Sequence, residues 1–177
     1  MRLWTVLRQA LAGWQMILRG EPDWRTQFSL TPAGLATALS IYAFVAFLAV
    51  AIAATSIGMP GAFGVLAAMV VLALPVIALA LSLLLTRNFL KSPAPLLPVL
   101  VPGIYALTAF LLIEGLLAMI GGPIVMLAWI GIGYLLFRLA RHVQAWSRGI
   151  AAGFAVLTVL MLVAMRLALY MVSTAPL

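Results

Sequence analysis

The stretch that decides the fold is LLPVLVPGIYALTAFLLIEGLLAMIGGPIVMLAWIGIGYLLFRL, residues Leu96–Leu139. A membrane-spanning helix needs about 20 mostly apolar residues, so this run is too long for one span. Gly121-Gly122-Pro123 interrupts it near the middle, and these residue types favour a turn. We therefore predict a hairpin of two spans, over residues 96–120 and 123–139.

Further apolar runs of the same kind cover residues 32–57, 62–86 and 150–172. The first begins at Thr31-Pro32, an N-cap residue type followed by a proline suited to the first helical position. Gly58-Met59-Pro60-Gly61 separates it from the second run, inside which Pro75 predicts a kink that neighbouring helices can compensate. The chain therefore has five predicted spans.

The composition agrees with that count. Of 177 residues, 67% are hydrophobic and only thirteen are charged, ten basic and three acidic. A soluble domain is about a quarter charged, so soluble enzymes and disordered tails are excluded, and the lack of cysteine excludes a disulfide scaffold. We predict an all-α polytopic membrane protein, with a cytoplasmic amphipathic helix and linker over residues 1–31 and five transmembrane helices within residues 32–177.

The basic residues predict the orientation. Positive charges near span ends collect on the cytoplasmic side. Nine of the ten fall on one side of a five-span arrangement: Arg2, Arg8, Arg19, Arg25, Arg87, Lys91, Arg138, Arg141 and Arg148. This pattern predicts a cytoplasmic N-terminus and a periplasmic C-terminus, and the use of Arg over Lys favours a bacterial inner membrane. Because the charges are spread along the membrane surface, we expect contact with anionic lipid and none with nucleic acid.

The N-terminal segment has the periodicity of an amphipathic helix that Glu21-Pro22-Asp23 ends. At 100° per residue the apolar residues share one face: Leu3, Val6, Leu7, Ala10, Leu11, Trp14, Ile17 and Leu18. Such a helix lies in the membrane interface, where Arg2, Arg8, Trp14 and Arg19 are the predicted membrane-surface residues. The alternative is a packing strut on the cytoplasmic end of the bundle, and both roles can coexist.

Two residues carry charge inside the spans, Glu114 in the third and Arg166 in the fifth. Both spans run outward, and both residues lie about 25 Å from the cytoplasmic end. Intramembrane charges are costly and usually pair, so matching depth predicts an ion pair. The pair could be a structural clamp, or it could handle protons, ions or a partner. Otherwise Arg166 snorkels to the outer surface and Glu114 is protonated.

Other features predict no catalytic, metal or cofactor site. His142, the only histidine, is expected to be solvated, and one histidine with three carboxylates and no cysteine is too few for a usual metal site. The four prolines of residues 92–103 predict a loop with a kinked entry to the third span, or an unwound substrate-binding segment. Gly149 and Gly153 form a GxxxG pattern, which favours packing within the chain or dimerisation.

The junction before the fifth span, Tyr134-Leu135-Leu136-Phe137 followed by Ser147-Arg148-Gly149-Ile150-Ala151, resembles that of the Yip (Ypt-interacting protein) family, bacterial type. That resemblance implies a five-span, non-enzymatic protein acting through membrane and protein contacts.

Three functions are compatible with these features. We favour an integral membrane accessory or scaffold protein that contacts lipids and either other membrane proteins or further copies of itself. The alternative is a small transporter or channel subunit using Glu114, Arg166 and the proline-rich entry to the third span. The third possibility is an enzyme acting on lipids, but the sequence lacks the catalytic groups that such an enzyme would need. A polar cavity reaching Glu114 would favour transport, whereas a lipid-facing or partner-facing groove would favour the accessory function.

Overall fold

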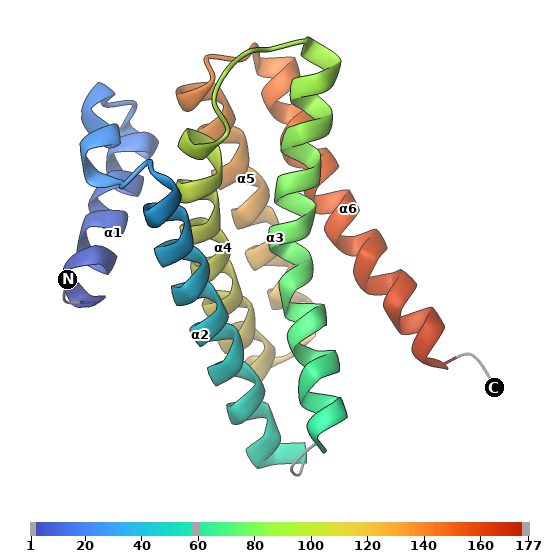
Figure 1. The fold of residues 1–177 in the computed structure, drawn as a ribbon. Coiled ribbons are helices and arrows are strands. Elements are labelled where there is room, and N and C mark those ends of the chain that lie inside the picture. Colours follow the sequence, from blue (N-terminus) through green and yellow to red (C-terminus); the bar gives the residue numbers. More distant parts are fainter. Residues whose placement is uncertain (1–2, 58–60, 175–177) are drawn as a thin grey trace.

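The computed structural model describes residues 3–57 and 61–174, so Arg2 and most of the predicted break at residues 58–61 lie outside the described residues. The described chain is all-helical (Figure 1). Its α-helices are α1 (Leu3–Arg19), α2 (Pro32–Ile57), α3 (Ala62–Leu90), α4 (Leu97–Ile120), α5 (Met126–Val143) and α6 (Arg148–Thr174), with 3-10 helices η1 (Pro22–Gln27) and η2 (Gly122–Val125). Helices α2 to α6 are long and apolar enough to cross a membrane, which confirms the predicted five-helix fold.

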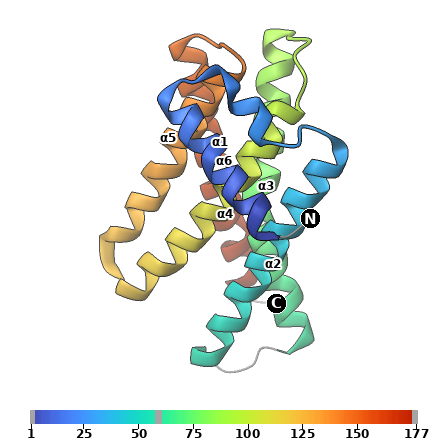
Figure 2. The same ribbon diagram turned by 90° about the vertical axis from the view of Figure 1, so that its left-hand side faces the viewer.

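The five long helices form a ring that is not in chain order. Helix α2 packs on α4, α4 on α5, α5 on α6, α6 on α3, and α3 returns to α2. Helix α3 also touches α4 across the ring (Figures 1 and 2). The core between them is apolar, with Leu79, Leu107, Leu136 and Phe154 fully buried. We call the end of the bundle that carries Arg87, Lys91, Arg138, Arg141 and Arg148 the basic end.

Helix α4 begins more regularly than the prolines predicted. Residues 92–96 form the expected loop, but the helix is continuous from Leu97. Pro98 lies in the first turn, where no helical partner for its nitrogen is missing, and Pro102 is fully buried inside the helix. The carbonyl of Leu96 accepts from the backbone N–H groups of Val99 and Leu100, at 3.0 and 2.9 Å. The alternative of an unwound segment is therefore wrong.

Several span boundaries also differ from the predictions, and among them α5 ends at Val143 rather than at Leu139 and α6 covers Arg148–Thr174 rather than residues 150–172. Helix α3 continues past Thr86 to Leu90, because no helix-breaking residue follows until Ser92-Pro93. Helix α5 begins at Met126, since the turn at Gly121 and Gly122, where φ is +80° and +70°, leads into η2 first. The N-cap expected at Thr31 is present, because its hydroxyl oxygen accepts from the backbone N–H of Gly34 at 3.1 Å.

Candidate functional site

Helix α1 lies against the side of the bundle near the basic end and slants across α4 and α5 (Figure 2). It is neither flat across that end nor free of the bundle. Its sequence, amphipathic as predicted, divides into three faces rather than two. The face toward the bundle is buried and consists of Ala10, Gly13, Trp14 and Ile17.

A second face of α1 is apolar but exposed, and it consists of Trp4, Leu7, Leu11 and Leu18. At 100° per residue these four side chains fall within a strip about 60° wide, between the buried face and the polar one. The polar face carries exposed Thr5, Arg8, Gln9, Gln15 and Arg19. We call the four exposed apolar residues the α1 strip. A helix with this order of faces can pack on the bundle and contact lipid at once.

Trp14 anchors α1 to the bundle. Its indole N–H donates to the carbonyl oxygen of Pro102 in α4 at 3.0 Å, and the side chain is only 8% exposed. The structure thus differs from the prediction of a membrane-surface role for Trp14. The hydrophobic periodicity identified the correct side of the helix, but it could not tell a protein-facing apolar residue from a lipid-facing one.

The C-terminal end of α1 is held by α5. Gly20, with φ +84°, ends the helix before Glu21-Pro22-Asp23 is reached. Backbone N–H groups of Gly20 and Glu21 both donate to the carbonyl of Met16, each at 2.9 Å. The Arg138 guanidinium donates to the carbonyl of Leu18. These bonds satisfy carbonyls that a helix end otherwise leaves unpaired.

His142 belongs to the same contact. Its Nε2 lies 3.2 Å from the carbonyl oxygen of Glu21, and the residue is half-buried. The expectation that His142 is merely solvated is therefore wrong. Together Arg138 and His142 tie α1 and its following turn to the basic end of α5.

The structure brings Glu114 and Arg166 together. Arg166 Nη1 lies 2.7 Å from Glu114 Oε1, and Nη2 lies 3.1 Å from Oε2. The pairing is bidentate, a geometry that adds both energy and orientation. The side chains are 14% exposed for Glu114 and 26% for Arg166. The two helices are not adjacent in the ring, because α5 lies between them.

Trp129 of α5 completes this site, and the sequence analysis missed it. The guanidinium carbon of Arg166 lies 5.0 Å from the centre of the Trp129 ring, a cation–π contact. The same ring meets Phe110 of α4 edge to face, with centroids 5.4 Å apart. The spacing could have predicted this contact. Trp129 lies seven residues after Gly122 and Glu114 lies seven residues before Gly121, so the two residues have equal depth in a hairpin of two spans.

We call Phe110, Glu114, Trp129 and Arg166 the charge cluster. Within it Arg166 Nε is buried and has no hydrogen-bond partner among the described residues, whereas both terminal nitrogens are used. The carboxylate of Glu114 is engaged on both oxygens. In residues 3–57 and 61–174 no three His, Asp or Glu side chains gather as a metal site would require. The arrangement fits a charge clamp better than a catalytic centre.

Gly149 and Gly153 do not pack against a neighbouring helix. Both are exposed on α6, and a Cβ built on either would meet no atom within 4 Å. The prediction that Gly149 and Gly153 pack against a helix of the same chain is therefore wrong. With exposed Ala152, Val156 and Leu160 they form an outward apolar face, which we call the α6 face.

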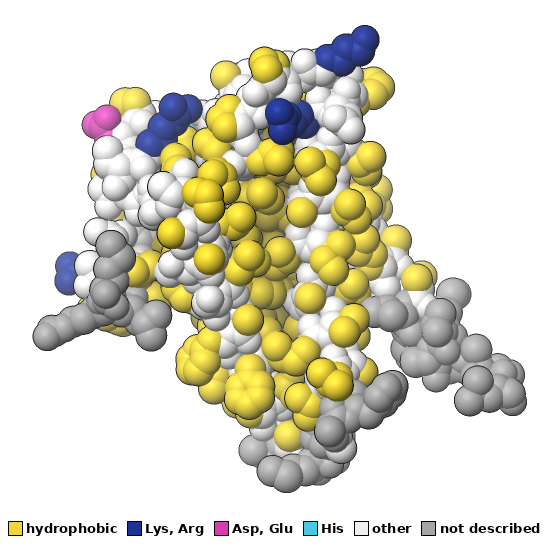
Figure 3. Space-filling view, viewed as in Figure 1, with side chains coloured by type: hydrophobic (Ala, Val, Ile, Leu, Met, Phe, Trp, Pro, Cys, Tyr) yellow, Lys and Arg dark blue, Asp and Glu magenta, His cyan; other side chains and the backbone are white. Residues whose placement is uncertain are grey.

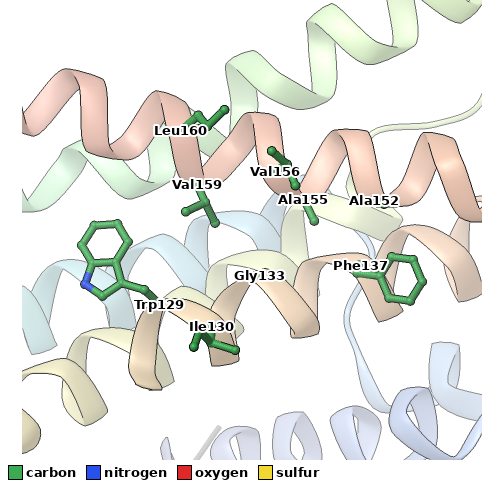
Figure 4. Close-up of a pocket in the computed structure, with 9 residues that line it drawn as sticks. All are labelled: Trp129, Ile130, Gly133, Phe137, Ala152, Ala155, Val156, Val159 and Leu160. Atoms are coloured by element: carbon green, nitrogen blue, oxygen red, sulfur yellow. The ribbon is translucent and has the colours of Figure 1, made fainter. Parts of the chain in front are cut away.

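Two apolar grooves flank the α6 face. One, of about 430 Å³, lies between α5 and α6 and extends from Trp129 to Phe137 (Figure 4). The other, of about 410 Å³, lies between α3 and α6 and includes Phe89 and Gly153. Neither groove includes Glu114. Figure 3 shows apolar side chains over much of the long helices on one side of the bundle.

No protein-family model matches this chain, and no match was found among curated proteins or solved structures. The resemblance to the Yip family therefore rests on the five spans and the junction before α6, without a family match. The fold and the composition together identify the chain as a polytopic membrane protein.

Proposed function

We propose that the protein is a non-enzymatic integral membrane accessory or scaffold protein, acting through its lipid-exposed surfaces and through helix contacts with partner membrane proteins. The observation that carries this proposal is the bidentate pairing of Glu114 with Arg166 beside Trp129. Intramembrane charges that serve transport have to take up an ion or exchange partners. Here the two intramembrane charges are already occupied by each other.

The exposed surfaces support the same proposal. The α1 strip is fixed in place by Trp14 and Arg138, so it can present four apolar side chains without unfolding from the bundle. The α6 face carries Gly149 and Gly153 outward, and small residues allow another helix to approach closely in a membrane. We propose the α6 face as the contact for a partner helix, whether from another protein or from a second copy.

Site-specific photo-crosslinking in intact membranes tests this function. A photoreactive residue at Val156, on the α6 face, should give a discrete protein adduct, identified by mass spectrometry. The matched control is Phe47 on α2, which is also exposed, at 53% against 56% for Val156, but belongs to neither proposed surface. Lipid-sized adducts alone at both positions, with a single unaccompanied species after purification in mild detergent, would contradict the proposal.

A small transporter or channel subunit is the second candidate, and one observation favours it. Arg166 Nε is a buried donor without a described partner beside a carboxylate at membrane depth. The test is flux of protons and monovalent ions in proteoliposomes. Flux that exceeds that of empty vesicles and is abolished by Glu114→Gln would establish transport, and flux equal to the background would leave the accessory function.

The proposed setting is a bacterial inner membrane, with the basic end in the cytoplasm. The described basic residues Arg87, Lys91, Arg138, Arg141 and Arg148 support it, since positive charges are retained on that side. We also propose that the protein is a bacterial relative of the Yip family. This relationship is consistent with five spans and a contact-based function, and it carries no residue role.

A further inference from the structure

The groove between α5 and α6 has a defined register along both helices. The lining residues nearest the basic end are Phe137 on α5 and Ala152 on α6 (Figure 4). Trp129 and Leu160 line it farther from that end. Eight residues on each helix correspond to about 12 Å. The hydrocarbon core is about 30 Å thick, so a groove of this length and place fits one leaflet.

Two arginines lie just beyond the groove at the basic end. Arg141 is four residues after Phe137 on α5, and Arg148 is four residues before Ala152 on α6. Residues four apart share a helix face, so each arginine continues the wall that its neighbour lines. Both arginines are exposed. An apolar groove thus ends at two cations on the same side of the bundle.

The Arg141 side chain is oriented toward the start of α6. Its Nη1 donates to the carbonyl oxygen of Trp146 at 2.8 Å, in the short connection before Arg148. A guanidinium has five N–H donors, so this bond leaves others for an anion. The two positive charges therefore lie on one stretch of chain at the mouth of the groove.

We propose that this groove binds an anionic phospholipid of the leaflet at the basic end, with one acyl chain along α5 and α6 and the phosphate at Arg141 and Arg148. The charges supply the argument for a lipid over a partner helix. An apolar helix would fill the groove but leave the two arginines without an anion, whereas an anionic headgroup on an apolar chain matches both parts. This site shares Ala152, Val156 and Leu160 with the α6 face, so a lipid here would lie against the edge of the proposed partner contact. It does not depend on that contact and needs only that the bundle spans a bilayer.

Native mass spectrometry of the full chain tests the proposal. The protein is reconstituted in nanodiscs of equal phosphatidylglycerol and phosphatidylcholine, released, and its bound lipid is counted. We expect one retained phosphatidylglycerol in preference to phosphatidylcholine. Arg148→Gln should lower that retention about fivefold, as expected for one cation near an anionic lipid. The matched control is Lys91→Gln, which removes an exposed charge at the basic end away from this groove and should retain the lipid.

A second pair of variants tests the groove itself. Gly133 lines it, and a Cβ there would lie 3.8 Å from Val159 Cγ2, so Gly133→Leu can fill the groove without a backbone clash. Gly131→Leu is the control, because a Cβ at Gly131 meets nothing within 4 Å and Gly131 does not line the groove. Lipid should be lost only from Gly133→Leu. Equal retention by both variants, equal retention of the two lipids by the unchanged chain, or a dimer mass that Gly133→Leu abolishes would overturn the proposal.

Discussion

The Arg166 guanidinium lies between the carboxylate of Glu114, 2.7 Å away, and the ring of Trp129, whose centre is 5.0 Å from its guanidinium carbon. Three consecutive helices, α4, α5 and α6, are thereby joined at one charged group. The contact joins an ion pair to an edge-to-face aromatic pair at membrane depth. The contributions of the ion pair and of the cation–π contact to the free energy of unfolding can be measured separately.

Removal of one charge should destabilise the bundle. Glu114→Gln leaves Arg166 without its counter-charge, and we expect a loss of about 3 kcal/mol in the free energy of unfolding. Denaturant unfolding in lipid–detergent micelles is the measurement. The double exchange Glu114→Arg with Arg166→Glu should restore part of that loss, incompletely because the cation then no longer faces Trp129 from α6. No recovery in the double variant would count against a stabilising pair.

The aromatic contribution can be isolated by a double-mutant cycle between Trp129→Leu and Arg166→Met. We expect a coupling free energy of about 1 kcal/mol, the usual size of a partly desolvated cation–π contact. The control is the same cycle with Trp146→Leu in place of Trp129→Leu. Trp146 contacts Phe154, with 5.6 Å between ring centroids, and belongs to no cation–π contact described for this chain. A coupling of zero for Trp129 with Arg166 would show that the two only lie near each other.

The two tryptophans of α1 should behave differently. Trp14→Phe removes the hydrogen bond to Pro102 and should cost about 1 kcal/mol, seen as faster amide exchange across α1. Trp4→Phe should leave exchange unchanged, since Trp4 is 71% exposed. In vesicles of brominated lipid the two variants should differ in the opposite sense. Bromine quenches the fluorescence of lipid-exposed tryptophan, so Trp4→Phe should reduce the quenched fraction of the fluorescence, whereas Trp14→Phe should not. Equal quenching losses would contradict a lipid-facing α1 strip.

Glycines that look alike in the sequence should differ in tolerance. A Cβ at Gly34 would overlap the backbone carbonyl oxygen of Ser29, so Gly34→Ala should destabilise the protein by about 2 kcal/mol. At Gly115 a Cβ meets nothing within 4 Å. There the higher helix propensity of alanine should give a gain of up to about 1 kcal/mol. Thermal unfolding of the two variants in the same detergent measures the difference.

The orientation can be tested without background labelling, because the chain has no cysteine. Ser147→Cys, in the exposed turn at the basic end, should react with a membrane-impermeant maleimide only from the cytoplasmic side. Gly61→Cys, exposed before α3, should react from the periplasm. The reverse pattern would mean that the positive charges do not set the orientation of this protein.

The sequence was sufficient for features that depend on position along one helix. Span count, the cap at Thr31 and the equal depth of Glu114 and Arg166 all follow from residue spacing. It was insufficient where rotation about a helix axis decides the contact. In α2, α3 and α4 apolar residues occur on every side, so periodicity cannot distinguish the core from lipid. On α6 the GxxxG spacing favoured packing of Gly149 and Gly153 within the chain, but the rotation of the helix turns both outward.

The ring order of the helices has a consequence for biosynthesis. Helix α3 rests mainly on α6, the last of the described helices to leave the ribosome, and Ser82 of α3 donates to the Met161 sulfur of α6 at 3.3 Å. Until α6 is inserted, Ser82 lacks this contact. The ring can therefore close only after α6 is inserted, and until then we expect lipid to cover that side of α3.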